Sequence, residues 1–341
     1  MRQAVMTKFK KIEVLDNPVP ELRADEVLLK IDACGICGSD LHIYTGNHPT
    51  IVPPVVMGHE FAGRVVKTGP AVTQWQVGDY AAGIPGVGCR ECEDCRSGKF
   101  NLCKQLKVIG GYYPGAFAEY TAVPETNLIR LPERFTAEEG AMLESLAVAV
   151  HIARRFTSVE GKAFAVFGAG PIGLLVIQVL KAFGARLVLS SDPIPVRREI
   201  AQKLGADFAI NPMEEKMMAL VQEHIGEIGL DGTVDCAGIE ATVNEAIDVT
   251  RNGGEIVIAA LFSGTPVIPL RMVQRSEKKI IGTQMYTRAD FEKSIELIEQ
   301  GKVRFQEMIT HKFPLERAAE AFTLAASKNP EVGKVIVHME R

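Results

Sequence analysis

The stretch that decides the fold is Phe164-Ala165-Val166-Phe167-Gly168-Ala169-Gly170-Pro171-Ile172-Gly173-Leu174-Leu175-Val176-Ile177. A short apolar run leads into G-x-G-x-x-G, and an apolar run with helical spacing follows. The first glycine permits a tight turn, the second lets the backbone approach a pyrophosphate, and the third lets the helix pack closely on the strand. Free N–H groups at the start of the helix would bind the phosphates. The stretch therefore predicts a strand, a turn and a helix that bind a dinucleotide through Gly168, Gly170, Pro171, Ile172 and Gly173.

An acidic residue follows the next predicted strand. Asp192 comes directly after Leu187-Val188-Leu189-Ser190-Ser191, the end of the second predicted strand. A carboxylate at this place accepts hydrogen bonds from both adenosine ribose hydroxyls and repels a 2′-phosphate, which favours NAD as the cofactor. Arg197 and Arg198 are residues that a 2′-phosphate would attract, but they are also compatible with a helix face that covers the edge of the cofactor.

Beyond this motif, strand and helix patterns alternate. Apolar runs typical of buried strands alternate with stretches of helical spacing, which predicts a doubly wound parallel sheet with helices on both faces. The predicted strands cover 163–167, 186–191, 207–210, 233–236 and 255–260, and the predicted helices cover 172–183, 196–204, 213–225 and 240–250.

The first third of the chain has a different pattern. Short alternating runs such as 26–31 and 61–66 are interrupted by turn residues, which predicts antiparallel strands in a barrel-like arrangement. A helix is predicted over 137–153, where Thr136 and Glu139 have the form of a capping box. The strand-like run 334–337 near the end does not continue the later alternation, so we expect it to return to the first domain.

Composition excludes several classes of protein. The 341 residues are 47% hydrophobic and 23% charged, with a formal net charge of −4, which argues against disorder, nucleic-acid binding and membrane-surface binding. No apolar leader opens the chain, and no run reads as a membrane span. The odd count of seven cysteines argues against a disulfide scaffold. A reducing cytoplasmic location is expected.

Four of the cysteines are closely spaced. Cys89, Cys92, Cys95 and Cys103 lie in one loop, near 86–106, and match a closed tetrahedral zinc site that has no open position for chemistry. A zinc-ribbon module that binds nucleic acid is the rival interpretation. The loop has few basic residues, which acids largely offset, and one aromatic, Phe100, so phosphate binding is unsupported.

A second set of possible ligands lies upstream of this loop. Cys37 and His59 are both zinc ligand types, and Glu60 follows His59. Two ligands do not make a site, however, and a lone His-Glu pair is more often a surface or core feature than a metal-binding one. From the residues alone, a catalytic metal and a structural role are about equally supported.

Five stretches together resemble the zinc-dependent medium-chain dehydrogenases. They are 35–42 (GICGSDLH), Gly58 to Val72 (GHE-x2-G-x5-G-x2-V), the four-cysteine loop, Gly168–Gly173 and Gly333-Lys334-Val335. They cover essentially the whole chain in the family's order. Within the family, 141–151 (AMLESLAVAVH) is similar to the sorbitol (L-iditol) dehydrogenase branch, in which Glu144 stands where simple alcohol dehydrogenases have a cysteine ligand.

The resemblance implies a fold and a set of site residues. It implies a GroES-like catalytic domain over 1–146 and 286–341, and a Rossmann domain over 147–285. Cys37 and His59 would bind a catalytic zinc, and Glu60 and Glu144 would bind it directly or through a water. Ser39 would pass the alcohol proton through the cofactor ribose toward His42 and solvent. Asp192 and Arg197 would bind the adenosine ribose. Two zinc ions per chain, NAD and a homo-oligomer, a tetramer or a dimer, are implied as well.

The implied reaction is hydride transfer between a secondary alcohol of a polyol or sugar and NAD. Two departures concern the substrate: Ser145 stands where polyol dehydrogenases usually have proline, and Met285-Tyr286 replaces an Arg-Tyr pair. Tyr286 and Tyr44 are candidate substrate contacts, although Tyr44 fits a packed barrel aromatic equally well. The alternatives are an amino-acid alcohol dehydrogenase of the threonine type and a crystallin-like, NADPH-binding relative. The latter generally lacks the zinc ligands that are present here.

Overall fold

The computed structural model describes residues 1–262, 264–327 and 329–339. Its backbone divides into two compact units. The first comprises Met1–Ser145, Thr287–Ile295 and Phe305–Arg341, and the second comprises Leu146–Tyr286 and Glu296–Arg304. Segment Glu296–Arg304, which the sequence analysis assigned to the first domain, groups with the second unit. Within that unit, the Gln178 side chain bonds both the N–H and the carbonyl of Arg304.

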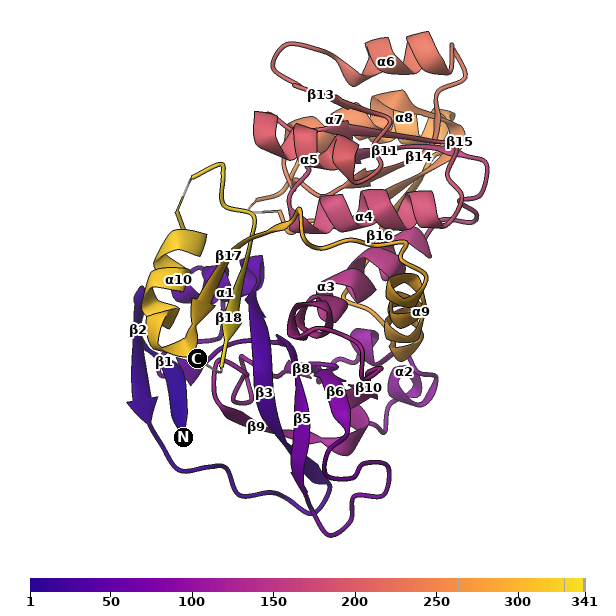
Figure 1. Cartoon of the computed structure of the whole chain (residues 1–341). Helices are drawn as coiled ribbons and strands as arrows, with labels where there is room; N and C mark the ends of the chain where they lie inside the picture. The colour runs from indigo at the N-terminus through magenta and orange to yellow at the C-terminus, as the bar shows by residue number, and fades with distance from the viewer. Residues whose placement is uncertain (263, 328, 340–341) are drawn as a thin grey trace. The chain divides into compact units, whose positions relative to one another are not determined.

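The first unit is rich in short strands. The largest sheet has the order β10-β6-β5-β3-β18-β17, and β9 pairs with β3 (Figure 1). Its strands are β3 (Glu26–Ile36), β5 (Glu60–Thr68), β6 (Tyr80–Gly83), β9 (Tyr120–Pro124), β10 (Leu128–Arg130), β17 (Ile309–Pro314) and β18 (Lys334–His338). A second sheet contains β2 (Lys11–Asp16), β1 (Arg2–Lys8) and β4 (Val55–Val56), and β7 (Gly86–Val87) pairs with β8 (Lys107–Val108).

The C-terminal strand completes this sheet. β18 pairs antiparallel with β3, through Val335 opposite Ile36 and Ile336 opposite Gly35. The expected return of the tail to the first domain is therefore confirmed. The apolar side chains of these strands form one core that includes Leu29, Phe61 and Val337.

Helices of the first unit are short. They are α1 (Gly38–Tyr44), α2 (Glu93–Arg96) and α10 (Ala318–Ala325), with 3₁₀ turns at Phe100–Leu102, Glu125–Asn127 and Leu315–Arg317. The unit boundary falls within α3 (Ala137–Ala153) and α9 (Arg288–Glu299). α3 begins at the predicted capping box, because the Thr136 and Glu139 side chains each accept the other's backbone N–H. None of the described helices has both the length and the apolar composition that crossing a bilayer requires.

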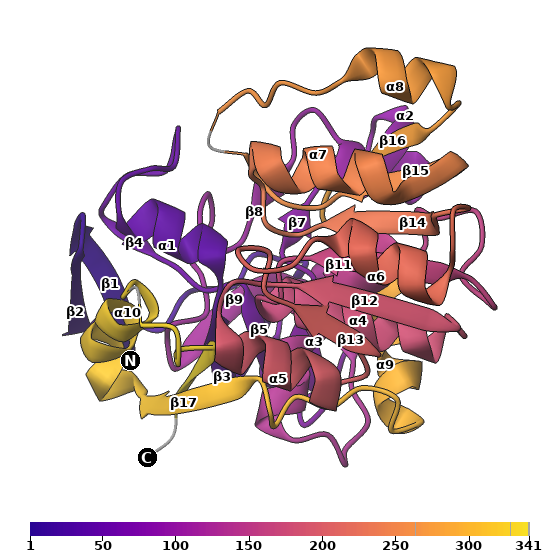
Figure 2. The same cartoon turned by 90° about the horizontal axis from the view of Figure 1, so that it is seen from above.

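The second unit contains a six-stranded sheet with the order β13-β12-β11-β14-β15-β16. Every neighbouring pair is parallel, which confirms the doubly wound sheet expected from the alternating pattern. Figure 2 shows these strands from above. They are β11 (Ala163–Phe167), β12 (Leu187–Ser191), β13 (Phe208–Ile210), β14 (Leu230–Asp235), β15 (Thr250–Ile258) and β16 (Lys279–Gly282).

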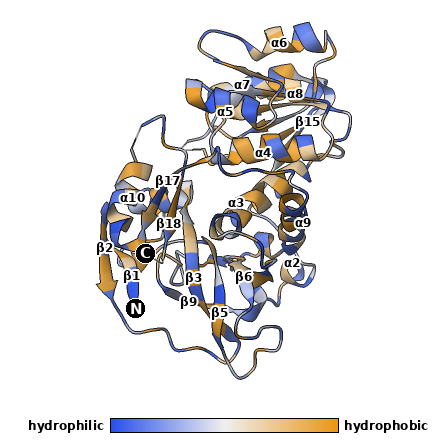
Figure 3. Cartoon of the chain, viewed as in Figure 1, coloured by the Kyte–Doolittle hydropathy of each residue, from blue (hydrophilic) through white to orange (hydrophobic). Residues whose placement is uncertain are grey.

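Helices flank both faces of this sheet, with α4 on one side and α6 and α7 on the other in Figure 1. Their bounds are α4 (Pro171–Ala182), α5 (Pro195–Lys203), α6 (Met217–His224), α7 (Glu240–Val249) and α8 (Leu270–Arg275). Orange, hydrophobic ribbon predominates in α4, whereas α5 also carries blue segments (Figure 3). Consistently, residues 173–180 of α4 are all buried, whereas only Ala201 is buried in α5.

Candidate functional site

Four cysteine sulfurs meet in one loop of the first unit. We call the site of Cys89, Cys92, Cys95 and Cys103 the cysteine lobe; its sulfurs lie within 4.8 Å of one another. Cys89 Sγ lies 4.0 Å from Cys95 Sγ. Zinc–sulfur bonds of about 2.3 Å in a tetrahedron put sulfurs about 3.8 Å apart, so the lobe fits a zinc ion.

Backbone N–H groups of the lobe point at its sulfurs. Cys92 N donates to Cys89 Sγ at 3.4 Å, and Cys95 N donates to Cys92 Sγ at 3.5 Å. Hydrogen bonds from the Glu91 and Cys92 backbone lower the pKa of Cys89 to about 6. Burial acts the other way on Cys95 and raises its pKa to about 12. The loop therefore favours the thiolate form of Cys89, and the thiolate is the form that binds metal.

A second group of ligand atoms lies at the start of two neighbouring elements. Cys37 precedes α1, directly after β3; His59 directly precedes β5, and Glu60 is the first residue of β5. Their ligand atoms lie within 4.8 Å of one another, and we call this group the buried centre. His59 is 9% exposed and Glu60 is fully buried. One thiolate, one imidazole and one carboxylate make a donor set that suits zinc and leaves a position open for a further ligand.

Asp40 orients two of these ligands, Cys37 and His59. Its Oδ2 accepts the Cys37 N–H at 2.9 Å, and its Oδ1 lies 3.3 Å from His59 Nδ1. Burial disfavours a charged imidazole, but the Asp40 carboxylate outweighs burial and raises the pKa of His59 well above its usual value. A carboxylate on Nδ1 leaves Nε2 as the metal-binding atom, which is a common arrangement at zinc sites.

Glu60 has two further buried neighbours, Ser145 and Lys334. Ser145 Oγ donates to Glu60 Oε1 at 2.6 Å. Lys334 forms an ion pair with Glu60 Oε2. Burial lowers the pKa of Lys334, but the charge of Glu60 reverses this and the net pKa is raised. Neither residue was predicted to belong to the site, although Ser145 lies in the stretch 141–151 and Lys334 in the stretch 333–335.

Glu144 stands on α3 next to Ser145 and is 7% exposed. It is not one of the three residues whose ligand atoms cluster at the buried centre. Its negative charge nevertheless contributes to the raised pKa of Lys334, so it lies in the same surroundings. This placement suits the water-mediated role that the resemblance allowed.

The two proposed proton carriers lie on α1. Ser39 Oγ is 3.3 Å from His59 Nε2, the atom that faces away from Asp40. His42 is exposed, one helical turn further along. Ser39 is therefore at the buried centre and His42 is at the solvent.

The two tyrosines considered as substrate contacts are both buried. The Tyr44 hydroxyl donates to the Lys10 carbonyl at 3.0 Å, and its ring lies 5.4 Å from that of Phe322. Tyr44 is therefore a packed aromatic of the barrel, the second of the two roles considered for it from the sequence. Tyr286 is fully buried in the second unit.

The glycine turn of the second unit lies at a cavity of about 1190 Å³. Gly168 has a φ of +92°, and a Cβ on Gly173 would lie 1.9 Å from the Gly168 carbonyl oxygen. Gly170 precedes α4, which begins with Pro171 and Ile172, and its missing Cβ faces open space. The turn, the close packing and the open approach expected of the three glycines are all present, so this cradle fits a pyrophosphate.

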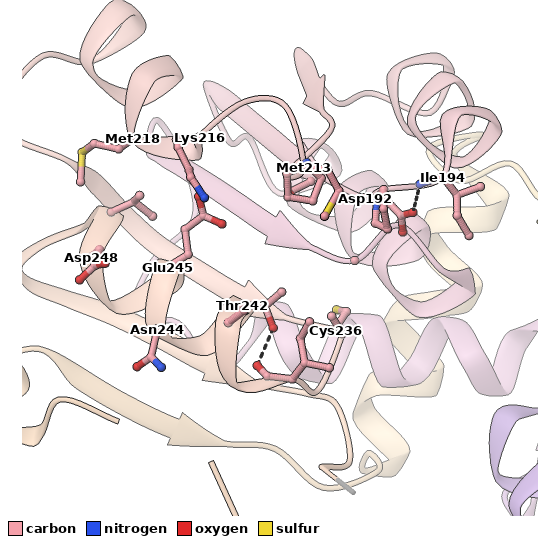
Figure 4. A pocket seen from close by; sticks show the side chains of 18 of the residues that line it. Asp192, Ile194, Met213, Lys216, Met218, Cys236, Thr242, Asn244, Glu245 and Asp248 are labelled. Atoms are coloured by element: carbon pink, nitrogen blue, oxygen red, sulfur yellow. Dashed lines mark hydrogen bonds between the residues drawn. The ribbon is translucent and has the colours of Figure 1, made fainter. Parts of the chain in front are cut away.

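Asp192 lies at the edge of the same cavity (Figure 4). Its Oδ2 accepts the Ala169 N–H at 2.8 Å, and its Oδ1 accepts the Ile194 N–H at 2.9 Å. Arg197 Nη1 lies 3.8 Å from Oδ2, whereas Arg198 donates to the Asp192 backbone carbonyl. The acid is thus held at the glycine turn, and Arg197 is the arginine that faces it.

Asp235 was not predicted as a site residue, but it holds a turn that lines the cavity. It ends β14, the strand next to β11, and accepts hydrogen bonds from Thr242 Oγ1 and from the Gly238 N–H. Burial raises its pKa. These bonds fix the turn after β14, whose Cys236 and Ala237 line the cavity. The sequence signal that could have identified Asp235 is its position as an acidic residue at the end of a central parallel strand.

Comparison with family models and curated relatives gives a consistent result. The model of the alcohol dehydrogenase GroES-like domain matches residues 23–133, and that of the zinc-binding dehydrogenases matches residues 171–300. Sorbitol dehydrogenase of Bacillus subtilis is 34% identical over 348 aligned positions, which cover 100% of this chain and 98% of the relative. A probable D-xylulose reductase A of Aspergillus terreus is 36% identical, with 93% of each chain covered.

Solved structures agree over nearly the full length. A zinc-binding dehydrogenase of Sinorhizobium meliloti bound to NADP has a TM-score of 0.92 and 29% identity, covering 99% of this chain and 98% of its own. 2R,3R-butanediol dehydrogenase of Bacillus subtilis has a TM-score of 0.92 and 31% identity. An Escherichia coli alcohol dehydrogenase complexed with NADH has a TM-score of 0.93 and 30% identity. The last two comparisons each cover 99% of both chains.

Proposed function

The chain belongs to the zinc-binding medium-chain dehydrogenases, and on that premise we propose that it oxidises one secondary hydroxyl of a polyol or sugar-derived substrate with NAD as hydride acceptor. As a zinc-dependent alcohol or polyol dehydrogenase, it shares this reaction class with its relatives. The finer assignment rests on one observation above all. The buried centre has a single thiolate beside an imidazole and a carboxylate, and Glu144, which stands where simple alcohol dehydrogenases have a cysteine ligand, lies in the same surroundings. Such a harder donor set suits a substrate with two neighbouring hydroxyls.

A zinc ion at the buried centre would supply Lewis acidity to the substrate hydroxyl, and NAD would supply the hydride acceptor. We expect Ser39, whose Oγ lies 3.3 Å from His59 Nε2, to accept the hydroxyl proton as it gives up its own toward the cofactor ribose. His42 then carries the proton to solvent from the exposed face of α1. Asp40 keeps His59 in the tautomer whose Nε2 is free for the metal.

The preference for NAD rests on Asp192. Its carboxylate is held at the glycine turn by two backbone N–H groups and keeps lone pairs for the ribose hydroxyls. A 2′-phosphate there would meet a like charge at short range. Arg197 offsets part of that repulsion, since it lies 3.8 Å from the same carboxylate. One solved relative is bound to NADP and another to NADH, so we would compare kcat/KM for NAD and NADP directly.

A substrate panel tests the proposal. We would follow NADH formation with sugar alcohols, aldonates, cyclitols and small vicinal diols, in parallel for wild type and Cys37→Ser. Oxidation of at least one polyol by wild type alone supports the proposal. Activity confined to simple monohydric alcohols, or to threonine, would reject the substrate class while keeping the family. Light scattering and cell fractionation test the expected homo-oligomer and the expected cytoplasmic location.

A further inference from the structure

Glu60 and Lys334 meet across an intervening strand. Glu60 lies on β5 and Lys334 on β18, and β3 lies between these strands. In the middle, Gly35 is opposite Glu60 on one side and Ile336 on the other. Adjacent strands are about 4.8 Å apart, so the two flanking strands are separated by about twice that distance. Their side chains pair only because they can reach over β3.

Gly35 provides the space for this pair. A Cβ at this position would lie 2.2 Å from Glu60 Oε2 and 3.0 Å from Lys334 Cε. Any side chain there would displace both groups. Gly35 does not have a positive φ, so backbone conformation does not require glycine here. The need for space does.

Ser145 approaches the same carboxylate from α3. Its Oγ donates to Glu60 Oε1 at 2.6 Å, and Lys334 Nζ donates to Ser145 Oγ at 3.5 Å. Ser145, Glu60 and Lys334 are 1%, 0% and 3% exposed. Glu60 Oε1 therefore accepts a hydrogen bond from a neutral hydroxyl, Oε2 forms an ion pair with an ammonium, and the three side chains form a closed cluster away from water.

Such a cluster is costly as a purely structural device. Removing a carboxylate and an ammonium from water costs several kcal/mol per ion, and apolar replacements often stabilise a protein equally well. The position of Glu60 gives the cluster a use, because its carboxylate lies within 4.8 Å of the Cys37 and His59 ligand atoms. A carboxylate has about four lone-pair positions, so two bound donors leave others for a metal.

We propose that Ser145 and Lys334 are positioning residues that fix the Glu60 carboxylate at the buried centre and thereby set that centre's affinity for its metal. The inference rests on the proposed function only in taking Cys37, His59 and Glu60 as a metal centre. It assigns a role to Ser145, whose hydroxyl supplies a hydrogen bond that the proline common at this place could not. Outer partners of metal ligands typically change metal affinity by about 10–100-fold.

Zinc competition with a chelator tests this on the full chain, without substrate. The variants are Ser145→Ala, Ser145→Thr and the control Ser294→Ala, which removes a buried hydroxyl that donates to the Asp290 carbonyl in the first unit. The measurements are zinc retained per chain and, after cobalt exchange, the absorption bands of each centre. We expect Ser145→Ala to lower the affinity of the buried centre about tenfold. The cysteine lobe should be unchanged, and both Ser145→Thr and the control should bind as wild type does.

Two results would overturn the inference. One is wild-type affinity of the buried centre in Ser145→Ala. The other is an equal loss at both centres, or an equal loss in Ser294→Ala, since either would indicate a general structural effect. Gly35→Ala is a second probe: its Cβ should displace the pair and weaken the buried centre at least as much. If Gly35→Ala does not fold, Ser145→Ala decides the question alone.

The same data separate this inference from the proposed function. Metal affinity is measured without substrate or cofactor, so a dependence on Ser145 can be found even if no polyol is oxidised. In that case the proposed function fails and the inference stands. Polyol oxidation by wild type, together with unchanged metal affinity in Ser145→Ala, would reject the inference alone.

Discussion

The cysteine lobe and the buried centre are built in opposite ways. The lobe takes its four ligands from residues 89–103, and backbone N–H groups of the same loop donate to their sulfurs. The buried centre takes its ligands from residues 37–60, with an orienting acid on α1 and donors to Glu60 from α3 and β18. The lobe is thus specified by local sequence. The buried centre exists only where distant elements pack together, which leaves it adjustable by residues far along the chain.

The largest expected effect breaks the buried centre. Cys37→Ser should lower turnover by more than about a hundredfold, because losing a ligand costs more than the 10–100-fold typical of its outer partners. The midpoint of thermal unfolding should change little, since the surrounding sheet keeps its core. Turnover by NADH formation and thermal unfolding measure the two effects. Cys34→Ala is the control, a buried cysteine outside the ligand group. Wild-type turnover of Cys37→Ser at matched zinc content would contradict the assignment.

Breaking the lobe should have the converse effect. In Cys95→Ser, the free energy of unfolding should fall by several kcal/mol, a fraction of the roughly 10–16 kcal/mol that structural zinc supplies in small domains. Turnover per folded molecule should fall much less. Denaturant unfolding with and without added zinc gives the measurement. If Cys95→Ser unfolds at the wild-type denaturant concentration, the lobe has no structural role and the contrast with the buried centre is lost.

A moderate effect is expected at the glycine turn, which, like the cysteine lobe, is predicted by the local sequence. Wild type should prefer NAD over NADP by about tenfold in kcat/KM, equivalent to about 1.4 kcal/mol. Asp192→Ser should narrow or reverse this preference, because the like charge facing a 2′-phosphate is removed while Arg197 stays. The ratio of kcat/KM for the two cofactors, with one active substrate, is the measurement. An NADP preference in wild type would show that the arginine outweighs the acid.

The smallest expected effect concerns the capping box at the start of α3, which binds neither metal nor cofactor. Thr136→Ala removes the side-chain acceptor of the Glu139 N–H at the start of α3. The free energy of unfolding should fall by about 1 kcal/mol, as is usual for a lost helix cap. Metal content and kcat should stay at wild-type values, although the same helix carries Glu144 and Ser145. Denaturant unfolding and zinc analysis check both points, and Thr136→Ser serves as the control. A loss of zinc in Thr136→Ala would show that α3 is positioned less firmly than its packing suggests.

The sequence predicted best what depends on neighbouring residues. The parallel sheet, the capping box at Thr136 and the glycine turn follow from periods and spacings within a few residues, and the structure confirms them. Tyr44 shows the limit. Its hydroxyl is satisfied by Lys10 and its ring packs near Phe322, and no spacing in the sequence reveals either contact.

The same limit explains why Lys334 and Ser145 were not recognised. Lys334 reaches Glu60 only because β18 pairs with β3 and Gly35 leaves room, which is a property of strand order. Ser145 was visible only as a departure from a family pattern. Its hydrogen bond to Glu60 could not be read from residues 85 positions apart. Side chains that orient ligands are set by the fold, whereas the ligand types themselves stand out in the sequence.

The late position of β18 has a consequence for how the protein is made. All four ligands of the lobe have been synthesised once Cys103 leaves the ribosome, whereas Lys334 comes 231 residues later (334 − 103). At about 5–20 residues per second, roughly 10–50 s of translation separate the two. A nascent chain can therefore acquire zinc at the lobe while it is still being extended. Glu60 receives its charged partner only after residue 334 has been synthesised, so the lobe can bind zinc before the surroundings of the buried centre are complete.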